Sequence, residues 1–185
     1  MSVKVVLKDV IGSYVYVREP RPDLNGKDNY SMQIIIKKND PQVDKIREAV
    51  KSVAHDAFGD KVKLGSLKLP LRDGDEERDE EIYKGCYFFN SKSIRAPQIV
   101  NKYNQPATEQ DLDEYCYSGA TFHVSLNFYS YEFSGNKGIA VGLQNIMLRK
   151  QTPRIDGSVS ATTEFAEFAD KNEEIVDDFA DDVPF

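Results

Sequence analysis

Apolar and polar residues alternate in five separate segments of the chain, which is the pattern of a half-buried β-strand. Val3, Val5 and Leu7 alternate along the first segment, and residues 14–17 resume the pattern beyond Gly12. The alternation predicts strands at residues 3–17, broken or bulged at Gly12, and at residues 29–38, 85–93, 120–133 and 139–150.

The connections between these segments differ in composition. Residues 18–28 contain two prolines and an Asn-Gly pair, which favour a loop. Residues 134–138, Ser-Gly-Asn-Lys-Gly, have the composition of a hairpin turn. Residues 59–82 form a long connection with little pattern, and such connections in a compact domain are usually functional or mobile.

A helix is predicted between the second and third strands. Asp40 suits the N-cap and Pro41 the first helical position. Apolar residues then recur three and four positions apart until a stop near Gly59, and they form one face: Val43, Ile46, Val50, Val53, Ala54 and Ala57. The irregular segment 108–115 is compatible with a second, short helix.

Five strands, an amphipathic helix and irregular loops favour an all-β fold with one or two helices. The oligonucleotide/oligosaccharide-binding (OB) fold, a five-stranded antiparallel barrel, is the commonest such shape that binds polymers. Other small barrels and α+β sheets are compatible with the same pattern. The helix that begins at Pro41 departs from the OB arrangement, whose helix lies between the third and fourth strands, where residues 108–115 fall.

Length and composition narrow the class of protein. The 185 residues suffice for one domain of about 150 residues and a tail. No run of 18 apolar residues is present, so we expect no membrane partner, and the N-terminus is a strand rather than a signal peptide. Cys86 and Cys116 lack a CxxC or Cys/His cluster, which predicts reduced thiols, no zinc site and a cytoplasmic location.

The net charge of −7 is distributed unevenly. From residue 164 onward nine acids face one base, so this segment carries −8 and residues 1–163 sum to +1. Residues 73–81 hold seven acids and one base, and the rest of residues 1–163 therefore carries +7. A positive surface with two acidic segments is expected of a protein that binds polyanions, and it is equally expected of an ordinary domain with acidic loops.

The same composition predicts the domain organisation. Residues 1–150 form the OB-fold domain, residues 151–163 a flexible linker, and residues 164–185 an acidic tail. The tail ends in an apolar tip after a run of carboxylates: Asp181, Asp182, Val183, Pro184 and Phe185. We expect these five residues to bind another protein, because acids steer toward basic partners and a terminal Phe can fill an apolar pocket.

Aromatic residues are the densest chemical signal, since twelve of the twenty Phe and Tyr lie between Tyr83 and Phe133. Parity in the fourth strand defines an apolar face made of Phe122, Val124, Leu126 and Phe128. The opposite, polar face carries His123, Ser125, Asn127, Tyr129 and Tyr131. Tyrosines on a polar face are candidates for stacking on bases, although tyrosine also packs commonly across neighbouring strands.

The third strand has similar content. If Lys92 faces solvent, parity places Phe88 and Asn90 beside it. Tyr87 and Phe89 then point inward, unless a bulge reverses the order. Lys92 and Arg95 would supply phosphate contacts beside an exposed ring, as a single-strand groove requires, and they are equally compatible with a solvated surface.

These patterns give two sets of candidate DNA-binding residues. The candidate stacking rings are Phe88, Tyr129 and Tyr131, followed by Tyr87 and Tyr103. The candidate phosphate contacts are Lys37, Lys38, Lys92, Arg95, Arg149 and Lys150. Stacking contributes about 1–3 kcal/mol per base, so two or three rings with cations suffice for useful affinity.

Catalysis has little support. His55 and His123 are far apart, and no phosphate-binding, zinc-protease or nucleophile-elbow motif is present. Residues 73–81 could in principle hold Mg²⁺, but metal ligands usually come from separated, rigid positions, whereas a consecutive run is usually a solvated face. We expect no catalytic residue, no metal site and no cofactor.

Several short motifs resemble a family of bacteriophage single-stranded DNA-binding proteins, formerly catalogued as a domain of unknown function, that includes replication proteins of enterobacterial phages. The motifs are Pro70-Leu71-Arg72-Asp73-Gly74-Asp75, Tyr83-Lys84-Gly85, Phe89-Asn90-Ser91-Lys92-Ser93, Tyr117-Ser118-Gly119, Gly135-Asn136-Lys137-Gly138-Ile139-Ala140 and Gly142-Leu143-Gln144-Asn145. The resemblance spans roughly residues 5–150, and the last five residues resemble the acidic tip of bacterial single-stranded DNA-binding proteins. It implies an OB fold and protection of single strands during phage replication or recombination.

The leading hypothesis is a non-enzymatic, largely sequence-independent protein that binds single-stranded DNA. Its tail would recruit replication proteins and compete with DNA, and duplex DNA and RNA stay open as further ligands. One rival is an acidic interaction protein or DNA mimic, whose acids would be spread over the body instead of concentrated in a loop and a tail. The other is a metal-dependent nuclease acting through Asp73, Asp75 and Glu76.

Overall fold

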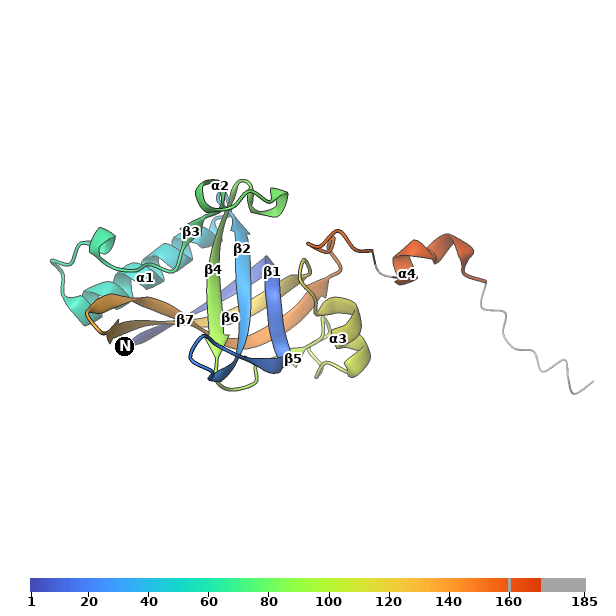
Figure 1. Ribbon diagram of the computed structural model, residues 1–185, viewed down its shortest axis with the longest axis horizontal. Helices are drawn as coiled ribbons and strands as arrows, with labels where there is room; N and C mark the ends of the chain where they lie inside the picture. The colour runs from blue at the N-terminus through green and yellow to red at the C-terminus, as the bar shows by residue number, and fades with distance from the viewer. Residues whose placement is uncertain (160, 171–185) are drawn as a thin grey trace, which may run out of the picture.

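Five long strands close into a barrel (Figure 1). The computed structural model describes residues 1–159 and 161–170. Its strands are β1 (Ser2–Pro22), β2 (Asp28–Lys37), β3 (Arg72–Asp73), β4 (Cys86–Ser93), β5 (Gln98–Val100), β6 (Thr121–Phe133) and β7 (Asn136–Lys150). The five long strands correspond to the five that the alternation predicts, while β3 and β5 are short additions.

The helices are short, with one exception. They are α1 (Gln42–Phe58), α2 (Gly74–Glu77), α3 (Glu109–Tyr115) and α4 (Ala161–Glu164), with 3-10 turns η1 (Leu64–Ser66), η2 (Glu81–Tyr83) and η3 (Ala166–Phe168). Within the described residues, no helix has the length and apolar composition needed to cross a membrane.

The barrel strands follow the order β4-β2-β1-β6-β7, and neighbours in this row are antiparallel. A parallel bridge between Lys92 of β4 and Gly142 of β7 closes the ring. Along the chain, α3 lies between the third and fourth barrel strands. The predicted five-stranded OB barrel is therefore confirmed, with α1 as an additional helix between its second and third strands.

The first strand changes direction at two bulges that flank Gly12. Asp9 and Tyr14 have φ angles of 51° and 46°, and the strand register shifts beside each of them. A Cβ on Gly12 would stand 2.6 Å from the Phe122 ring and 2.9 Å from the Met32 sulfur. The break predicted at Gly12 thus falls on either side of it, and glycine is required there because the strand crosses directly over core side chains.

The loop predicted at residues 18–28 is shorter in the structure. β1 continues to Pro22, and its last residues pair with the start of β2. This part of β1 has a paired strand on one side only, where proline is tolerated because no ladder bond is lost on the open side. The remaining turn is residues 23–27, in which the Asp23 carboxylate accepts the backbone N–H of Lys27 at 3.0 Å.

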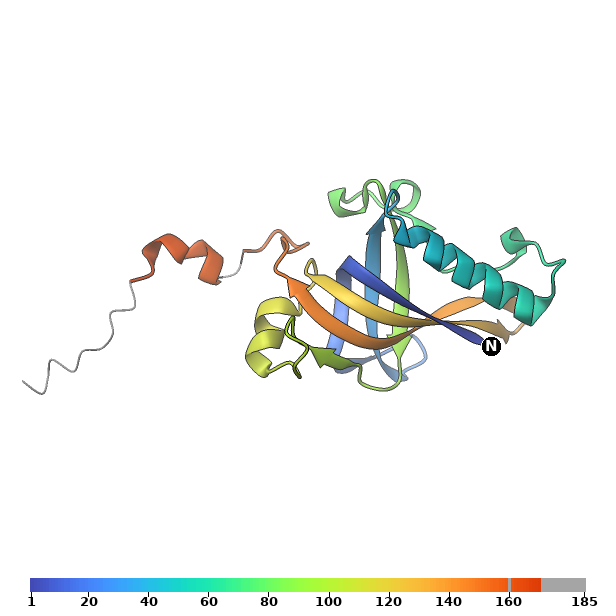
Figure 2. The ribbon, with the colours of Figure 1, turned by 180° about the vertical axis from the view of Figure 1, so that it is seen from behind.

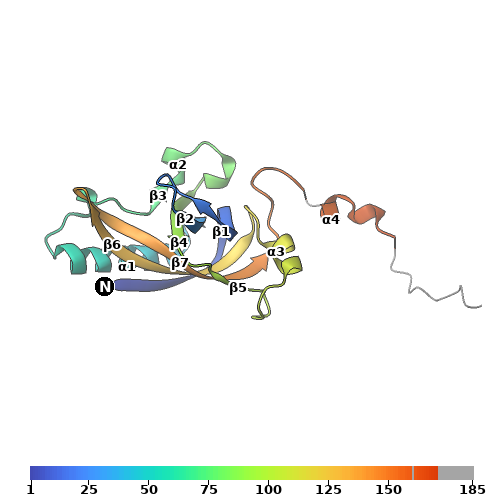
Figure 3. The ribbon, with the colours of Figure 1, turned by 60° about the horizontal axis from the view of Figure 1, so that its bottom comes forward.

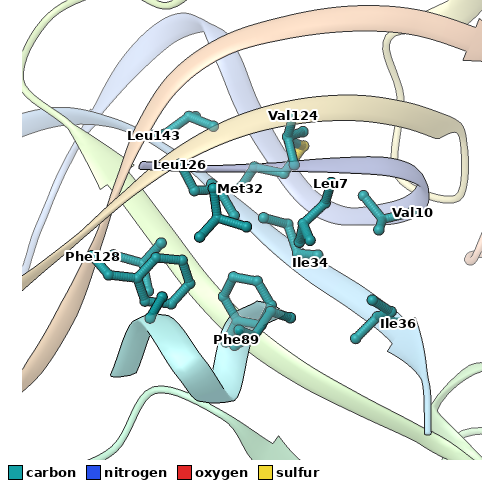
Figure 4. Packing of buried hydrophobic residues seen from close by; sticks show 14 of the residues in the cluster. Leu7, Val10, Met32, Ile34, Ile36, Phe89, Val124, Leu126, Phe128 and Leu143 are labelled. Carbon is teal, nitrogen blue, oxygen red and sulfur yellow. The ribbon is translucent and has the colours of Figure 1, made fainter. Parts of the chain in front are cut away.

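Apolar side chains from the barrel strands and from α1 fill the interior. Figure 4 shows the rings of Phe89 and Phe128 beside the helix, with their centroids 6.3 Å apart, and Leu7 and Met32 among the aliphatic side chains around them. The predicted apolar face of β6 is buried completely: Phe122, Val124, Leu126 and Phe128. The parity interpretation of this strand is confirmed.

Helix α1 lies across one end of the barrel near the N-terminus (Figure 2). Its predicted apolar face is buried except at Ala57, which is exposed, and Ala49 joins that face. The N-cap position is taken by Pro41 instead of Asp40. The Asp40 carboxylate nevertheless accepts the backbone N–H of Gln42 at 2.9 Å, so it still satisfies a free donor of the first turn.

The second half of the long connection 59–82 folds over the outer face of β2 and β4 (Figure 3), whereas Val62, Leu64 and Leu67 in its first half pack against the main core. β3 pairs with β4, and η2 places Tyr83 against Phe88, Ile35 and Cys86 in a second, smaller core. The Tyr83 and Phe88 rings meet edge to face, with centroids 5.2 Å apart. One part of the outer sheet surface is therefore covered, while the part farther along β4 is not.

The first residues of the predicted linker lie against the barrel. The Tyr117 hydroxyl donates to the Thr152 carbonyl oxygen at 2.6 Å, and the Ile155 N–H donates to the Ser118 carbonyl oxygen at 3.2 Å. The Arg154 guanidinium lies 4.1 Å from the centroid of the Tyr117 ring. The boundary at residue 150 stays a prediction, but residues 151–155 contact the body.

Both cysteines are free thiols. Burial raises the pKa of the Cys116 thiol to about 11, and it also raises the pKa of Cys86. Because the thiolate is the reactive form, thiols held protonated at neutral pH are poor nucleophiles.

Candidate nucleic-acid interface

Two neighbouring hollows on the outer surface of the barrel share Lys92 as a lining residue. The first hollow, of about 600 Å³, lies between the β1–β2 turn, the end of β4 and the middle of β7. The second, of about 510 Å³, lies between β2, β4, the start of β7 and residues 69–72. The two hollows together are called the groove below.

Small residues of β7 lie opposite the tyrosines of β6 along the groove. Tyr129 pairs with Ala140, and Tyr131 pairs with Gly138. A Cβ on Gly138 would stand 2.5 Å from the Lys68 carbonyl oxygen and 2.7 Å from the Tyr131 hydroxyl oxygen, so only glycine fits at this position. Both tyrosines are half-buried, with Tyr129 lining the first hollow and Tyr131 the second. Both rings thus border the groove from β6, and an aromatic ring of this kind can stack on a base.

Lys92 and Arg95 are exposed cations at the end of β4 and line the first hollow. Across residues 1–159 and 161–170, no carboxylate lies within ion-pair distance of either side chain. Lys27 enters the same hollow from the β1–β2 turn. The hydrogen bond from the Lys27 N–H lowers the pKa of the Asp23 carboxyl, and the charge of Lys92 lowers it further.

Tyr14 extends over the second hollow from its bulge in β1. The side chain is 47% exposed, and its φ of 46° is a conformation that bulky residues rarely adopt and that occurs preferentially at functional sites. Leu69 contributes to another wall of the hollow. That segment is fixed to β7 by two backbone bonds, from the Lys68 N–H to the Lys137 carbonyl at 2.9 Å and from the Ile139 N–H to the Lys68 carbonyl at 3.0 Å.

The structure brings four of the predicted DNA-binding residues to the groove: Tyr129, Tyr131, Lys92 and Arg95. They come from two strands and a loop that the barrel closure places side by side. Stacking rings next to cations are the two components that single-strand binding needs. The other predicted residues lie elsewhere.

The prediction that Phe88 is exposed is wrong, because its ring is fully buried. The parity behind it is correct: Phe88 lies on the outer face of β4 with Lys92, and Phe89 points into the barrel. Tyr83 and its neighbours cover this stretch of the face, which removes a large apolar ring from water. Phe88 therefore presents no free ring face in this structure.

Lys37, Lys38 and Tyr87 lie at the opposite end of the β2–β4 pair from Lys92. The Lys38 ammonium lies 2.7 Å from a carboxylate oxygen of Asp73, and equally close to Asp75. Tyr87 is half-buried, and its hydroxyl accepts a hydrogen bond from a side chain of α1 at 2.9 Å. These three residues lie outside the groove, which does not favour their contact with DNA. That contact stays a prediction.

The remaining candidates are also outside the groove. Tyr103 is 73% exposed in the loop before α3, with the Lys102 ammonium 5.3 Å from its ring centroid. Arg149 Nε lies 3.8 Å from a carboxylate oxygen of Asp9, and Lys150 is the last residue of β7. The predicted protein-binding tip, residues 181–185, lies outside the described residues.

The acidic stretch 73–81 is bound to the body of the protein. The Asp75 carboxylate accepts the Gly85 N–H at 2.9 Å, and Arg72 donates to the Glu77 carboxylate at 2.6 Å. In the described part of the chain, no group of three His, Cys, Asp or Glu side chains is placed to hold a metal ion. These contacts make the stretch part of the cover over the second core.

The family model described as "Enterobacter phage Enc34, ssDNA-binding protein" matches residues 3–176 of the chain. The chain belongs to this family. The matched residues include the barrel, the groove, the acidic stretch 73–81 and the first part of the tail, and they end nine residues before the C-terminus. The family assignment agrees with the resemblance that the short motifs predict.

Solved structures of the Enc34 family share the fold. The single-stranded DNA-binding protein from bacteriophage Enc34 in complex with ssDNA superposes with a TM-score of 0.70 at 19% identity, covering 80% of this chain and 86% of that one. A second structure of the single-stranded DNA-binding protein from bacteriophage Enc34 superposes with a TM-score of 0.69 at 18% identity, covering 88% of this chain and 89% of that one. Its C-terminal truncation gives 0.68 at 20% identity, covering 80% and 86%. No curated protein sequence matches the chain.

Several residues of the groove are not among the predicted DNA-binding residues, although parity places Asn90 beside Lys92: Tyr14, Lys27, Arg72, Asn90 and Gln144. One signal was present in the sequence, because small residues alternate at positions 138, 140 and 142. Their meaning depends on the register that sets them opposite the tyrosines of β6. Tyr14 had no local signal, since only the bulge in β1 turns it toward the groove.

Proposed function

We propose that this protein binds single-stranded DNA without strong sequence preference, and that the groove is its binding site. The observation that supports the proposal most is the placement of Tyr129 and Tyr131 beside Lys92 and Arg95, two exposed cations with no described carboxylate partner. The rings would stack on bases and the cations would contact phosphates. Membership of the Enc34 family supports the same ligand.

Titration of the full chain with short labelled oligonucleotides tests this function. We expect binding at low salt that weakens steeply as salt rises, because phosphate contacts release counterions. Competition with unlabelled duplex DNA and RNA then ranks the three ligands, with single-stranded DNA expected to compete best. Absence of binding to any single strand at low salt would refute the proposal.

We further propose that the acidic tail competes with DNA for the groove. Residues 164–185 carry −8, whereas the groove offers Lys92, Arg95 and Lys27, so the tail can act as an internal polyanion. Deletion of this segment should raise the affinity for DNA. A matched variant that keeps its length but replaces its acids with Asn and Gln should do the same, and unchanged affinity in both variants contradicts the competition.

The second role proposed for the tail is to recruit replication proteins through its apolar tip. A chain with Phe185→Ala keeps the charge of the tail and loses the ring expected to fill a partner's pocket. We expect this variant to bind DNA as the unchanged protein does while its capture of replication proteins fails. If the variant still captures replication proteins, the acidic residues of the tail recruit them and the Phe185 ring does not.

In the cell, we propose that the protein covers single strands during phage replication or recombination in the host cytoplasm and performs no catalysis. Protection of a labelled single strand from an added nuclease measures the first part. Incubation of the same strand with the protein and Mg²⁺ measures the second, and new fragments would favour the metal-dependent nuclease through Asp73 and Asp75. The ion pairs of both carboxylates with Lys38 argue against that reading.

A further inference from the structure

A chain of hydrogen bonds runs from the second core to the surface of the groove. Gln33 of β2 and Asn90 of β4 are directly paired across the two strands. The Gln33 side chain, only 3% exposed, donates from Nε2 to Asn90 Oδ1 at 3.2 Å. Behind it, the hydroxyl of Tyr83 donates to Gln33 Oε1 at 2.5 Å. Tyr83 itself is 2% exposed.

The direction of this chain is set at its buried end. Burial raises the pKa of the Tyr83 phenol, while a hydrogen bond with the Ser13 side chain opposes the shift. The phenol therefore stays protonated at neutral pH and acts as a donor. Gln33 Oε1 accepts from this hydroxyl, which leaves Gln33 Nε2 as the donor on the side of Asn90. The Gln33 amide consequently points its N–H toward Asn90.

The surface end of the chain is a fixed amide. Asn90 is exposed and lines the second hollow of the groove. Asn90 Oδ1 accepts from Gln33, which orients the amide, and its NH₂ is the donor that it offers to the groove. The charged neighbours in the same hollow, Arg72 and Lys92, are donors as well. Tyr14 and Tyr131 add rings on which a base can stack next to the amide.

We propose that this hollow prefers bases that offer a carbonyl oxygen, thymine before adenine, and that Tyr83 and Gln33 are positioning residues that set the preference through Asn90. The inference rests on the proposed DNA-binding function. Thymine presents two carbonyl oxygens on its pairing edge, whereas adenine presents an amino group beside a ring nitrogen. An amino group set against the Asn90 NH₂ meets donor with donor, so adenine fits this position less well.

The test measures the ratio of dissociation constants for oligo-dA and oligo-dT of equal length, and compares that ratio between variants. Single strands of dA and dT also differ in flexibility and self-stacking, but this difference is the same for every variant and cancels. Tyr83→Phe removes only the phenol donor, which frees Gln33 and Asn90 to turn over. The control is Tyr115→Phe, which removes a phenol at the end of α3, away from the groove.

We expect Tyr83→Phe to lower the preference for dT by about fivefold, the effect of one neutral hydrogen bond, while the salt dependence of binding stays unchanged. Tyr115→Phe should keep the ratio of the unchanged protein. Asn90→Asp places a carboxylate in the hollow, where one oxygen accepts from Gln33 and the other faces the base. It should weaken binding to both strands and shift the ratio toward dA.

Two results would overturn the inference. One is a ratio that stays the same in Tyr83→Phe and in Asn90→Asp. The other is an equal loss of affinity for dT and dA in Tyr83→Phe, which indicates a purely structural role for the phenol. A thermal melt of each variant accompanies the titrations. Failure of the unchanged protein to bind either strand is a different outcome, because it refutes the proposed function itself.

Discussion

The two ends of the β2–β4 pair carry similar cations in opposite surroundings. Lys37 and Lys38 stand at one end, where Lys37 pairs with Cys86, and Lys92 stands six residues farther along β4, opposite Ser31. At the rise of a β-strand the two ends are about 20 Å apart. At the first end Lys38 is bound to two carboxylates, whereas at the second no described carboxylate pairs with Lys92.

The difference originates in the acidic stretch 73–81. This segment folds onto the Lys38 end, and Asp40 and Glu80 border the same hollow as Lys37 there. The hydrogen bond to Asp73 is the main cause that raises the pKa of Lys38, and the same contact lowers the pKa of Asp73. Folding thus neutralises Lys38 at one end, and it leaves Lys92 and Arg95 without a described ion pair at the groove end, where the stacking rings are.

The largest expected effect comes from removing both rings at the groove end. The double substitution Tyr129→Ala and Tyr131→Ala should weaken binding of single-stranded DNA by about a hundredfold, since each stacked base contributes about 1–3 kcal/mol. A polarisation titration measures the change, and circular dichroism checks the fold. Tyr103→Ala is the control outside the groove, and an equal loss in that variant would place the interface elsewhere.

The next effect separates the cations of the two ends. Lys92→Ala with Arg95→Ala should weaken binding about tenfold and reduce the slope of log K against log salt by about 1.4, because two phosphate contacts are lost. Lys37→Ala with Lys84→Ala removes the same charge from the other end and should leave the slope unchanged. Equal slopes for the two double variants would contradict the comparison.

Releasing Lys38 should have a smaller effect that depends on salt. Asp73→Asn with Asp75→Asn keeps hydrogen-bond acceptors and frees the ammonium group. We expect affinity for DNA to rise about threefold at low salt. The rise should disappear near physiological salt, because the groove lies beyond the screening length of about 8 Å. A gain that persists at high salt would mean that DNA contacts the Lys38 end directly.

The smallest effect concerns stability. Lys38→Met removes the partner of Asp73 and Asp75, and the melting temperature at neutral pH should fall by about 2 °C, as expected for an exposed ion pair. The pKa values of both carboxyls are lowered in the folded protein. The ion pairs therefore contribute their full stabilisation above pH 3.8, the ordinary pKa, and this contribution is lost as pH falls through the lowered pKa values. The two proteins should therefore melt alike near about pH 2. A difference that persists there would assign the effect to packing.

Much of the fold could be predicted because it depends on local patterns. The alternation in β6 is enough to identify Phe122 and Phe128 as core residues. The spacing in α1 predicts its buried face for the same reason, since period and polarity are properties of the sequence. The ends of the strands were predicted less well, because tertiary contacts determine them. β1, for example, continues to Pro22 because its last residues pair with β2.

The candidate site was predictable only in part. Tyr129 and Tyr131 were identified because parity alone puts them outside the core. Phe88 has the correct parity and the wrong environment, because a distant segment carrying Tyr83 covers it. Parity also placed Asn90 beside Lys92, but its hydrogen bond to the buried Gln33 depends on the pairing of two strands. Tyr14 was missed because a strand bulge turns it toward the groove.

The sequence by itself determined five strands, one long helix, the segregation of acids into a stretch and a tail, and the aromatic content of β4 and β6. Each of these follows from residue type and spacing. The tertiary structure alone decided which cations remain free and which rings remain exposed. The physical reason is that burial and ion pairing depend on distances between segments far apart in the chain, such as the one that joins Lys38 to Asp73.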